Sequence, residues 1–208
     1  MSKFDYKKLV CGKGFNNLKG ETNSIAYSAW RGMITRCYSK NSHSNRPSYI
    51  GCSVAKDWLT FSNFKRWHDE NYVESFQLDK DLLVSGNKVY SKDTCAYVPS
   101  YINSLLTDSE VNRGKYPRGV TLSKRGRYQA KCSRSITNQV SYSSQHDSVF
   151  EAARAYCNAK INYVRSVIGH SIEKNDISDD LGQSIISTAV NQLNQVIDAA
   201  RKSHLESY

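Results

Sequence analysis

Basic and hydrogen-bonding side chains alternate with small or apolar ones in the segment GRYQAKCSR, residues 126–134. Side chains two positions apart lie on the same face of a β-strand. One face therefore carries side chains that suit a protein core: Tyr128, Ala130 and Cys132. The opposite face carries hydrogen-bonding groups, two of them cationic: Arg127, Gln129, Lys131 and Ser133. Such a surface attracts the phosphate groups of a nucleic-acid backbone.

The charge of the whole chain points to a polyanionic partner, and its distribution indicates where that partner binds. The 208 residues carry a formal net charge of +10. Residues 109–168 contain eleven Lys and Arg against three Asp and Glu, whereas residues 169–208 contain three against six. From Arg113 to Arg134 there are eight basic residues and no acidic one. A positive field concentrated in one segment is typical of a nucleic-acid interface.

The basic segment belongs to a set of three expected strands, at about residues 117–123, 127–134 and 138–144. Gly126 marks the first turn and Thr137-Asn138 the second. A helix is expected next, in DSVFEAARAYCNAKINYVRSVI, because Ser148 and Glu151 form a capping box at its start. We expect an α+β unit in which a three-stranded antiparallel sheet packs on this helix.

The preceding part of the chain contains a mixture of expected helices and short strands. Apolar residues at helical spacing predict a helix in SIAYSAWRGMITRCYS and a second one around Trp58–Trp67. The polar residues 39–48 between them predict a loop. Leu78, Leu82 and Leu83 suggest a short strand and CAYVP another, and Pro99 opens a short helix through Leu106.

The acidic C-terminal segment contains a further expected helix with an apolar stripe over residues 181–201. We expect this helix to pack back on the body of the protein, and a weak dimer contact through the same stripe is the alternative. The expected organisation is thus α+β with three parts: residues 1–108, 109–168 and 169–208.

The chain lacks the sequence features of membrane, secreted and zinc-finger proteins. It contains no run of about 18 apolar residues, and MSKFDYKKLVCGKG has no signal-peptide core. We therefore expect a cytoplasmic protein. The six cysteines include no CxxC pair, so zinc is not an expected cofactor. A looser site combining Cys37, Cys52 or Cys95 with a histidine stays open.

Residues 117–165 resemble the DNA-binding domain of plant ethylene-response factors, the apetala-type fold. The motifs that carry the resemblance are RGV at 118–120, GRYQA at 126–130 and EAARAYCNAK at 151–160. The resemblance implies a sheet that lies in the DNA major groove, with Val120, Leu122, Tyr128, Ala130 and Cys132 turned toward the helix. The residues expected to face DNA are Arg118, Ser123, Lys124, Arg125, Arg127, Gln129, Lys131, Ser133 and Arg134. The chain departs from the plant pattern at Arg125, where a Trp is typical, and at Thr121 and Ser123, which replace arginines.

Residues 24–106 resemble the front half of phage proteins that join an HNH-type nuclease to such a DNA-binding domain. The motifs are AWRGMITRCYS, YIGCSVAKDWLTFSNFKRW, LDKDLLVSGNKVYS and DTCAYVPSYIN, in that order. The resemblance, which extends to free-standing homing endonucleases, implies a ββα-metal fold that binds Mg²⁺ or Mn²⁺. It implies metal ligands at Asp79, Asp81 and Asn103, and catalytic roles for Asp79, Lys80 and Asn103. His68 is a further catalytic candidate, as the only histidine close in sequence to this motif, and a surface histidine in the polar segment RWHDENY is the more common case. The usual base histidine is absent, since Asp79 or Lys80 stands in its place.

Two functions follow as expectations, both with double-stranded DNA as the partner. The first is a Mg²⁺-dependent DNA endonuclease of the homing type that nicks its target, in the cytoplasm of a bacterial host if the protein is phage-encoded. The alternative is a DNA-binding regulator or anti-defence protein built on a degenerate HNH fold. RNA binding is less favoured, because the basic face lacks the exposed aromatic platform that single strands require.

Overall fold

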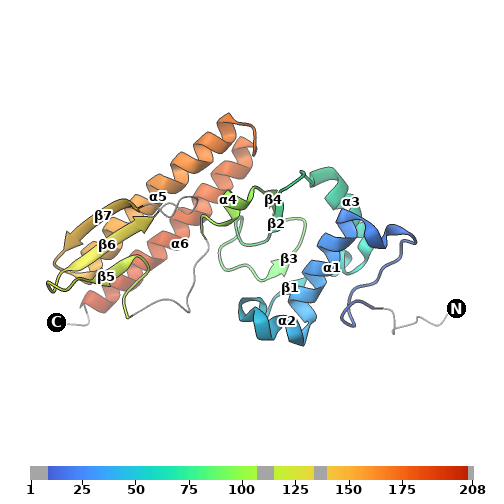
Figure 1. Cartoon of the computed structure of the whole chain (residues 1–208), viewed down its shortest axis with the longest axis horizontal. Coiled ribbons are helices and arrows are strands. Elements are labelled where there is room, and N and C mark those ends of the chain that lie inside the picture. Colours follow the sequence, from blue (N-terminus) through green and yellow to red (C-terminus); the bar gives the residue numbers. More distant parts are fainter. Residues whose placement is uncertain (1–8, 107–114, 134–139, 206–208) are drawn as a thin grey trace. The chain divides into compact units, whose positions relative to one another are not determined.

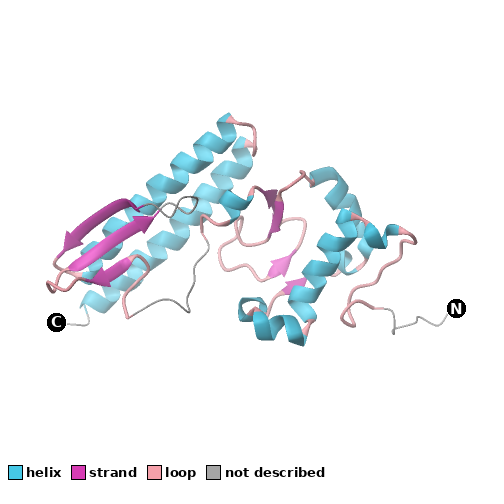
Figure 2. Cartoon of the chain, viewed as in Figure 1, coloured by secondary structure: helices cyan, strands magenta, loops and turns pink. Residues whose placement is uncertain are grey.

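The computed structural model describes residues 9–106, 115–133 and 140–205 (Figure 1). The chain divides into two compact units, Met1–Tyr97 and Val98–Tyr208. Helices and strands occur in both units, and the second contains a three-stranded antiparallel sheet with two long helices (Figure 2). The expected α+β class is therefore confirmed.

The first unit joins helices to very short strands. Its elements are α1 (Ile25–Tyr38), α2 (Lys40–Asn45), β1 (Ser53–Val54), α3 (Phe61–Asn71), β2 (Gln77–Asp79) and β3 (Val89–Tyr90), with β4 (Ala96–Val98) at its end. Strands β1 and β3 pair in parallel, and β2 pairs with β4. The two strands expected around the LDKD motif are thus present as β2 and β4. Strands β1 and β3 were not predicted, because a strand of two residues is too short to show an alternation of polar and apolar side chains.

Helix α1 forms where the apolar spacing predicted it. Ser24 caps its first turn by accepting a hydrogen bond from the backbone N–H of Tyr27. Its apolar face places Trp30, Met33 and Ile34 in a core that they share with α3. The Trp30 indole donates to the carbonyl of Trp58 at 2.7 Å, which satisfies the one polar group of this buried ring.

The loop expected at residues 39–48 is wrong, because α2 occupies residues 40–45. Ser39 caps this short helix by accepting from the N–H of Ser42. His43 is held by a hydrogen bond between its Nε2 and the carbonyl of Arg36 at the end of α1. These are local polar interactions, so the helix has no apolar periodicity by which it could be predicted.

The second unit contains the basic sheet and two long helices. Its elements are α4 (Ser100–Asn103), β5 (Val120–Leu122), β6 (Tyr128–Ser133), β7 (Val140–His146), α5 (Val149–Glu173) and α6 (Asp179–Leu205). The sheet order is β5-β6-β7, with Gln129 opposite both Thr121 and Gln145. The three strands, their order in sequence and the Ser148 cap of α5 are as predicted. Helix α4 is shorter than expected and ends at Asn103 instead of Leu106.

One face of the sheet packs on α5 as the alternation predicted, with one exception. Val120, Ala130 and Cys132 are buried against the helix. Leu122 was expected to be turned toward the helix as well, but 48% of it is exposed. It is the last residue of β5, at the turn that leads to β6, so it gains little cover from the helix.

Gly119 allows the sheet and α5 to approach each other closely. Its φ is +75°, and a Cβ atom added to it would lie 2.0 Å from Cδ2 of Tyr156 on α5. No side chain fits between the two elements at this point. The glycine of the RGV motif is thus explained by packing rather than by contact with a ligand.

Helix α6 packs along α5, and this confirms the expected packing of the C-terminal helix on the body. Leu193 and Ala200 are buried in the core shared with the sheet. The expected connector at 169–180 is shorter in the structure, because α5 continues to Glu173 and α6 starts at Asp179. None of the helices within the described ranges has the length and apolar character needed to span a membrane.

Candidate functional site

The outer face of the sheet is a polar surface that is built from all three strands. Strand pairing places Gln129 beside Thr121 and Gln145, and Lys131 beside Ser143. The Gln129 amide donates to the hydroxyl of Ser143 at 3.0 Å, which fixes its orientation. We call this surface the outer sheet face: Thr121, Gln129, Lys131, Ser133, Ser143 and Gln145.

The turn between β5 and β6 adds two more cations. The N–H of Ser123 donates to the carbonyl of Arg127, and its hydroxyl accepts from the N–H of Arg127. Gly126 closes the turn with a φ of +78°. Lys124 and Arg125 lie between these residues and are exposed. Within the described ranges neither they nor Lys131 form an ion pair, so three cations remain available to a ligand.

Arg127 differs from the other predicted DNA contacts, because it forms an ion pair. Its Nε lies 2.9 Å from a carboxylate oxygen of Asp147, and the two side chains are 46% and 83% exposed. A pair that is this open to water contributes little to stability, so a stronger anion can displace the carboxylate. Asp147 lies just after β7, at the rim of the outer sheet face.

Arg118 lies nearer to the helix than expected. It is half-buried, and its charge acts on Cys157 and Lys160 of α5. Burial lowers the pKa of Lys160, and the positive charge of Arg118 lowers it further. Arg118 therefore lies close to α5, and its contact with DNA stays a prediction. Arg134 lies outside the described residues, whereas Ser133 is exposed.

Asp79 organises the loop that follows β2. One of its carboxylate oxygens, Oδ1, accepts hydrogen bonds from the N–H groups of Asp81 and Leu82 at 2.6 and 2.8 Å. Burial raises the pKa of Asp79 above its ordinary value, and these two backbone donors only partly oppose that rise. The carboxylate thus stabilises the turn, and its raised pKa makes it a better base than an exposed aspartate.

Lys80 is a buried cation in the middle of the LDKD motif, with 5% of it exposed. Its ammonium donates to Asp81 and to the carbonyl of Asn87, and lies 5.8 and 5.7 Å from the ring centroids of Tyr49 and Tyr90. The Asn87 amide in turn donates to the carbonyls of Lys80 and Val89. We call residues 79–87 the LDKD loop; its polar groups are bound largely to one another.

His68 is buried, and the expectation of a surface histidine in RWHDENY is wrong. Its ring stacks on Tyr72 at 4.7 Å and meets Tyr97 edge-on at 5.5 Å. Burial lowers its pKa, although nearby Asp69 opposes this. The burial of His68 could have been predicted from the sequence. Phe61, Phe64 and His68 are three and four positions apart, and residues at this spacing share one face of a helix.

Asn103 belongs to the second unit, on α4, whereas the other three predicted catalytic residues belong to the first. Asp79 and Asp81 lie close enough for the charge of Asp81 to raise the pKa of Asp79. Within the described ranges, no three His, Cys, Asp or Glu side chains are grouped as a metal site.

Cys37 and Cys95 are buried, and burial raises the pKa of each to about 12, which disfavours the thiolate that a metal binds.

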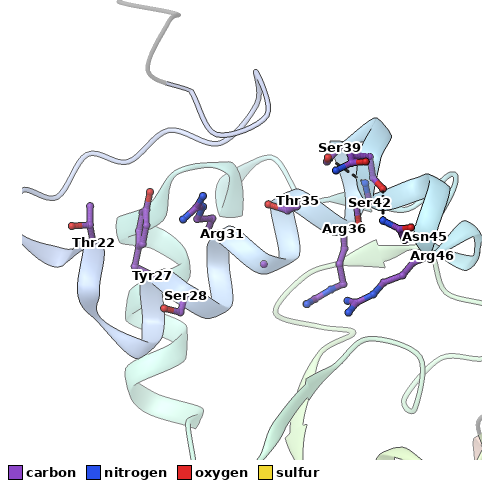
Figure 3. A pocket seen from close by; sticks show the side chains of 12 residues that line it. Thr22, Tyr27, Ser28, Arg31, Thr35, Arg36, Ser39, Ser42, Asn45 and Arg46 are labelled. Carbon is purple, nitrogen blue, oxygen red and sulfur yellow. Dashed lines mark hydrogen bonds between the residues drawn. The ribbon is translucent and has the colours of Figure 1, made fainter.

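Sequence reasoning missed a polar cleft on the first unit, lined by residues of α1, α2 and their flanks (Figure 3). Three arginines and several hydroxyl groups line it. Ser28, Arg31 and Thr35 are spaced by three and four along α1, so they form a polar stripe on one face of the helix. This stripe is the feature of the sequence that could have indicated the cleft.

Comparisons with known proteins give no family for this chain. It matches no protein-family model, no curated protein and no solved structure.

Proposed function

We propose that the chain binds double-stranded DNA through the outer sheet face and the adjoining turn. The observation that carries this proposal is the combination of three exposed cations, which form no ion pair with any described residue, with a row of uncharged hydrogen-bonding groups. Lys124, Arg125 and Lys131 supply the charge, and the Gln129–Ser143 pair lies beside them. The carboxylate of Asp147 stands at the rim, where its ion pair with Arg127 is open to water.

The two kinds of side chain would have different tasks. Exposed Lys and Arg bind phosphates and fix the register of a protein on the duplex, without reading sequence. The major groove is wide enough for a β-ribbon, and a glutamine there can form two hydrogen bonds to adenine. Gln129 would read a base in this arrangement, and its position on the central strand supports that role.

The test is a fluorescence-anisotropy titration of a labelled 20-base-pair duplex at several salt concentrations. With about four phosphate contacts, the logarithm of the binding constant should fall with the logarithm of salt at a slope of about −4. Lys131→Ala should reduce the slope by about 1. Lys174→Ala removes an exposed lysine of the same unit away from the sheet and is the matched control. A slope near zero, or equal losses in both variants, would contradict the proposal.

A second candidate function is Mg²⁺-dependent cleavage of a phosphodiester at the LDKD loop. The observation in its favour is the raised pKa of half-buried Asp79 next to the exposed carboxylate of Asp81. Mg²⁺ in proteins is commonly held by one or two carboxylates together with substrate phosphates. The second oxygens of Asp79 and Asp81 fit that donor set, and the bound ion would stabilise a leaving oxygen.

This second candidate is tested by metal binding and by cleavage in parallel. Mn²⁺ binding followed by electron paramagnetic resonance should be lost in Asp81→Asn and kept in Asp93→Asn, an exposed aspartate outside the loop. Supercoiled plasmid should be nicked with Mg²⁺ or Mn²⁺ and spared in the presence of chelator. Absence of both Mn²⁺ binding and nicking, with DNA binding intact, would favour the regulator or anti-defence alternative.

A further inference from the structure

The cleft on the first unit is a basic feature that the proposed function does not use. It is open to solvent, has a volume of about 640 Å³ and is bordered by α1 and α2. Arg31, Arg36 and Arg46 line it, and no Asp or Glu in the described part of the chain does. An opening with three guanidinium groups and no carboxylate is a site for an anion, because unscreened positive charge attracts phosphate.

The cleft forms because α1 has an apolar face that packs in the core and a polar face that does not. Its apolar face enters the core through Trp30, Met33 and Ile34. Ser28, Arg31 and Thr35 follow one another on the other face at spacings of three and four. Helix α2 then adds hydroxyl and amide groups at the end of this stripe. The helix thus presents a continuous row of hydrogen-bond donors about 10 Å long from Ser28 to Thr35.

The three arginines differ in how far they are already engaged. The Nε of Arg36 donates to the hydroxyl of Tyr90 at 3.1 Å, and its guanidinium lies over the rings of Tyr49 and Tyr90. Arg31 and Arg46 are exposed and have no ion-pair partner within the described residues. Figure 3 shows Arg36 and Arg46 extending in the same direction from α1 and from the residue after α2, whereas Arg31 extends away from them. Arg36 is therefore a fixed charge, whereas no ion pair within the described residues holds Arg31 or Arg46 in place.

Gly32 gives independent support, because it lies in the middle of α1 without a packing reason. A Cβ atom added to it would meet only Nη1 of Arg36, at an ordinary contact distance of 3.4 Å. Glycine in a helix interior costs about 1 kcal/mol relative to alanine. A glycine that the fold does not demand, on the wall of an arginine-lined cleft, allows a ligand to approach the helix backbone.

We propose that this cleft binds backbone phosphates of DNA and forms a second contact, separate from the outer sheet face. The proposal rests on the proposed DNA binding. Arg31 and Arg46 bind phosphate oxygens, Arg36 supplies fixed positive charge, and the Ser28 and Thr35 hydroxyls donate to the strand. Because these groups contact phosphates and not base edges, the second contact adds affinity without sequence preference.

The first experiment compares two double variants of the full chain in the anisotropy titration. Arg31→Ala/Arg46→Ala should weaken binding at least tenfold at 0.1 M salt and reduce the salt slope by about 2. Lys56→Ala/Arg66→Ala removes two exposed cations of the same unit outside the cleft and is the charge-matched control. Equal losses in the two variants would overturn the proposal, since net charge alone would then explain them.

The second experiment separates the cleft from the outer sheet face and from a free oligophosphate. Gly32→Ala should raise the unfolding temperature and yet weaken DNA binding several-fold; unchanged affinity would overturn the proposal. Calorimetry with inorganic triphosphate tests whether the cleft instead binds a free oligophosphate. Triphosphate binding that needs Arg31 and Arg46, with DNA affinity unaffected by their loss, would assign the cleft to free oligophosphates and overturn the DNA assignment. Failure of the outer sheet face is recognised separately, by unchanged binding in Lys131→Ala.

Discussion

The outer sheet face and the LDKD loop are both rich in charge, but they use it in opposite ways. On the sheet, Lys124, Arg125 and Lys131 point to solvent with no carboxylate partner in the described part of the chain. In the loop, Asp79 accepts two backbone hydrogen bonds, and buried Lys80 is bound by Asp81 and the carbonyl of Asn87. Charges on the sheet are available to a ligand, whereas charges in the loop mainly hold the fold.

This difference shows that a charged motif in a sequence has two physical interpretations. A charge that already has a partner stabilises the native state, and its removal is felt as instability. A charge without a partner costs the fold little to lose, and its removal is felt in binding. Substitutions in the two regions should therefore separate stability from DNA affinity.

The largest effect is expected from neutralising the exposed cations of the sheet. Lys124→Ala/Arg125→Ala/Lys131→Ala should weaken DNA binding about 300-fold at 0.1 M salt, since each lost phosphate contact removes about 0.9 from the salt slope. The unfolding temperature should stay within a degree or two of the wild type, because all three are exposed and none is paired with a residue that the structure describes. Anisotropy and calorimetry measure the two quantities.

The matched control for this triple variant is Arg165→Ala/Lys174→Ala/Lys202→Ala, which removes three exposed cations of α5 and α6. It has the same net charge as the sheet variant. If both triple variants lose affinity equally, the sheet contributes only general charge and the comparison with the loop no longer holds.

The sequence predicted the sheet well because period-two alternation is a physical consequence of strand geometry. It could not predict which basic residues would be available. Arg127 pairs with Asp147, twenty positions away, and Arg118 lies near Lys160 of α5. Such contacts depend on how strands and helices meet in three dimensions. The cleft was missed for the same reason, since it combines a polar stripe of α1 with α2, a helix defined by local capping.

The next largest effect concerns the packing of the sheet on α5. The loss of stability on substitution by alanine should differ between Gly119 and Gly126. Gly119→Ala should lower the free energy of unfolding by about 3 kcal/mol, because the new methyl group overlaps the ring of Tyr156 and φ is positive. Gly126→Ala has the same sign of φ but open space around it, so its cost should be about 1 kcal/mol. Urea denaturation measures both, and equal costs would mean that α5 and the sheet do not meet closely at Gly119.

A smaller effect is expected from the loop. Asp79→Ala should cost about 1–2 kcal/mol of stability, because the N–H groups of Asp81 and Leu82 lose their acceptor. Asp79→Asn keeps a side-chain oxygen at the same place and should cost less. DNA affinity should change in neither variant. A large loss of affinity in Asp79→Asn, with stability kept, would instead place the carboxylate in contact with the nucleic acid or its metal ion.

The smallest effect concerns pH and the first unit, where buried His68 lies in an aromatic cluster with Tyr72 and Tyr97. Burial lowers the pKa of His68 in the folded state, with Asp69 opposing and Lys65 assisting the shift. The unfolded chain therefore binds a proton at higher pH than the folded protein does. The stability contributed by neutral His68 is complete above about pH 6.5 and is lost as pH falls below that value.

His68→Phe keeps an aromatic ring but cannot titrate, so it isolates this contribution. Thermal unfolding between pH 7.5 and 5.5 should lower the melting temperature of the wild type more than that of His68→Phe. Equal pH dependence in the wild type and His68→Phe would mean that His68 has the same pKa folded and unfolded. Its ring would then have to be solvated, as the side chains of the outer sheet face are, rather than enclosed.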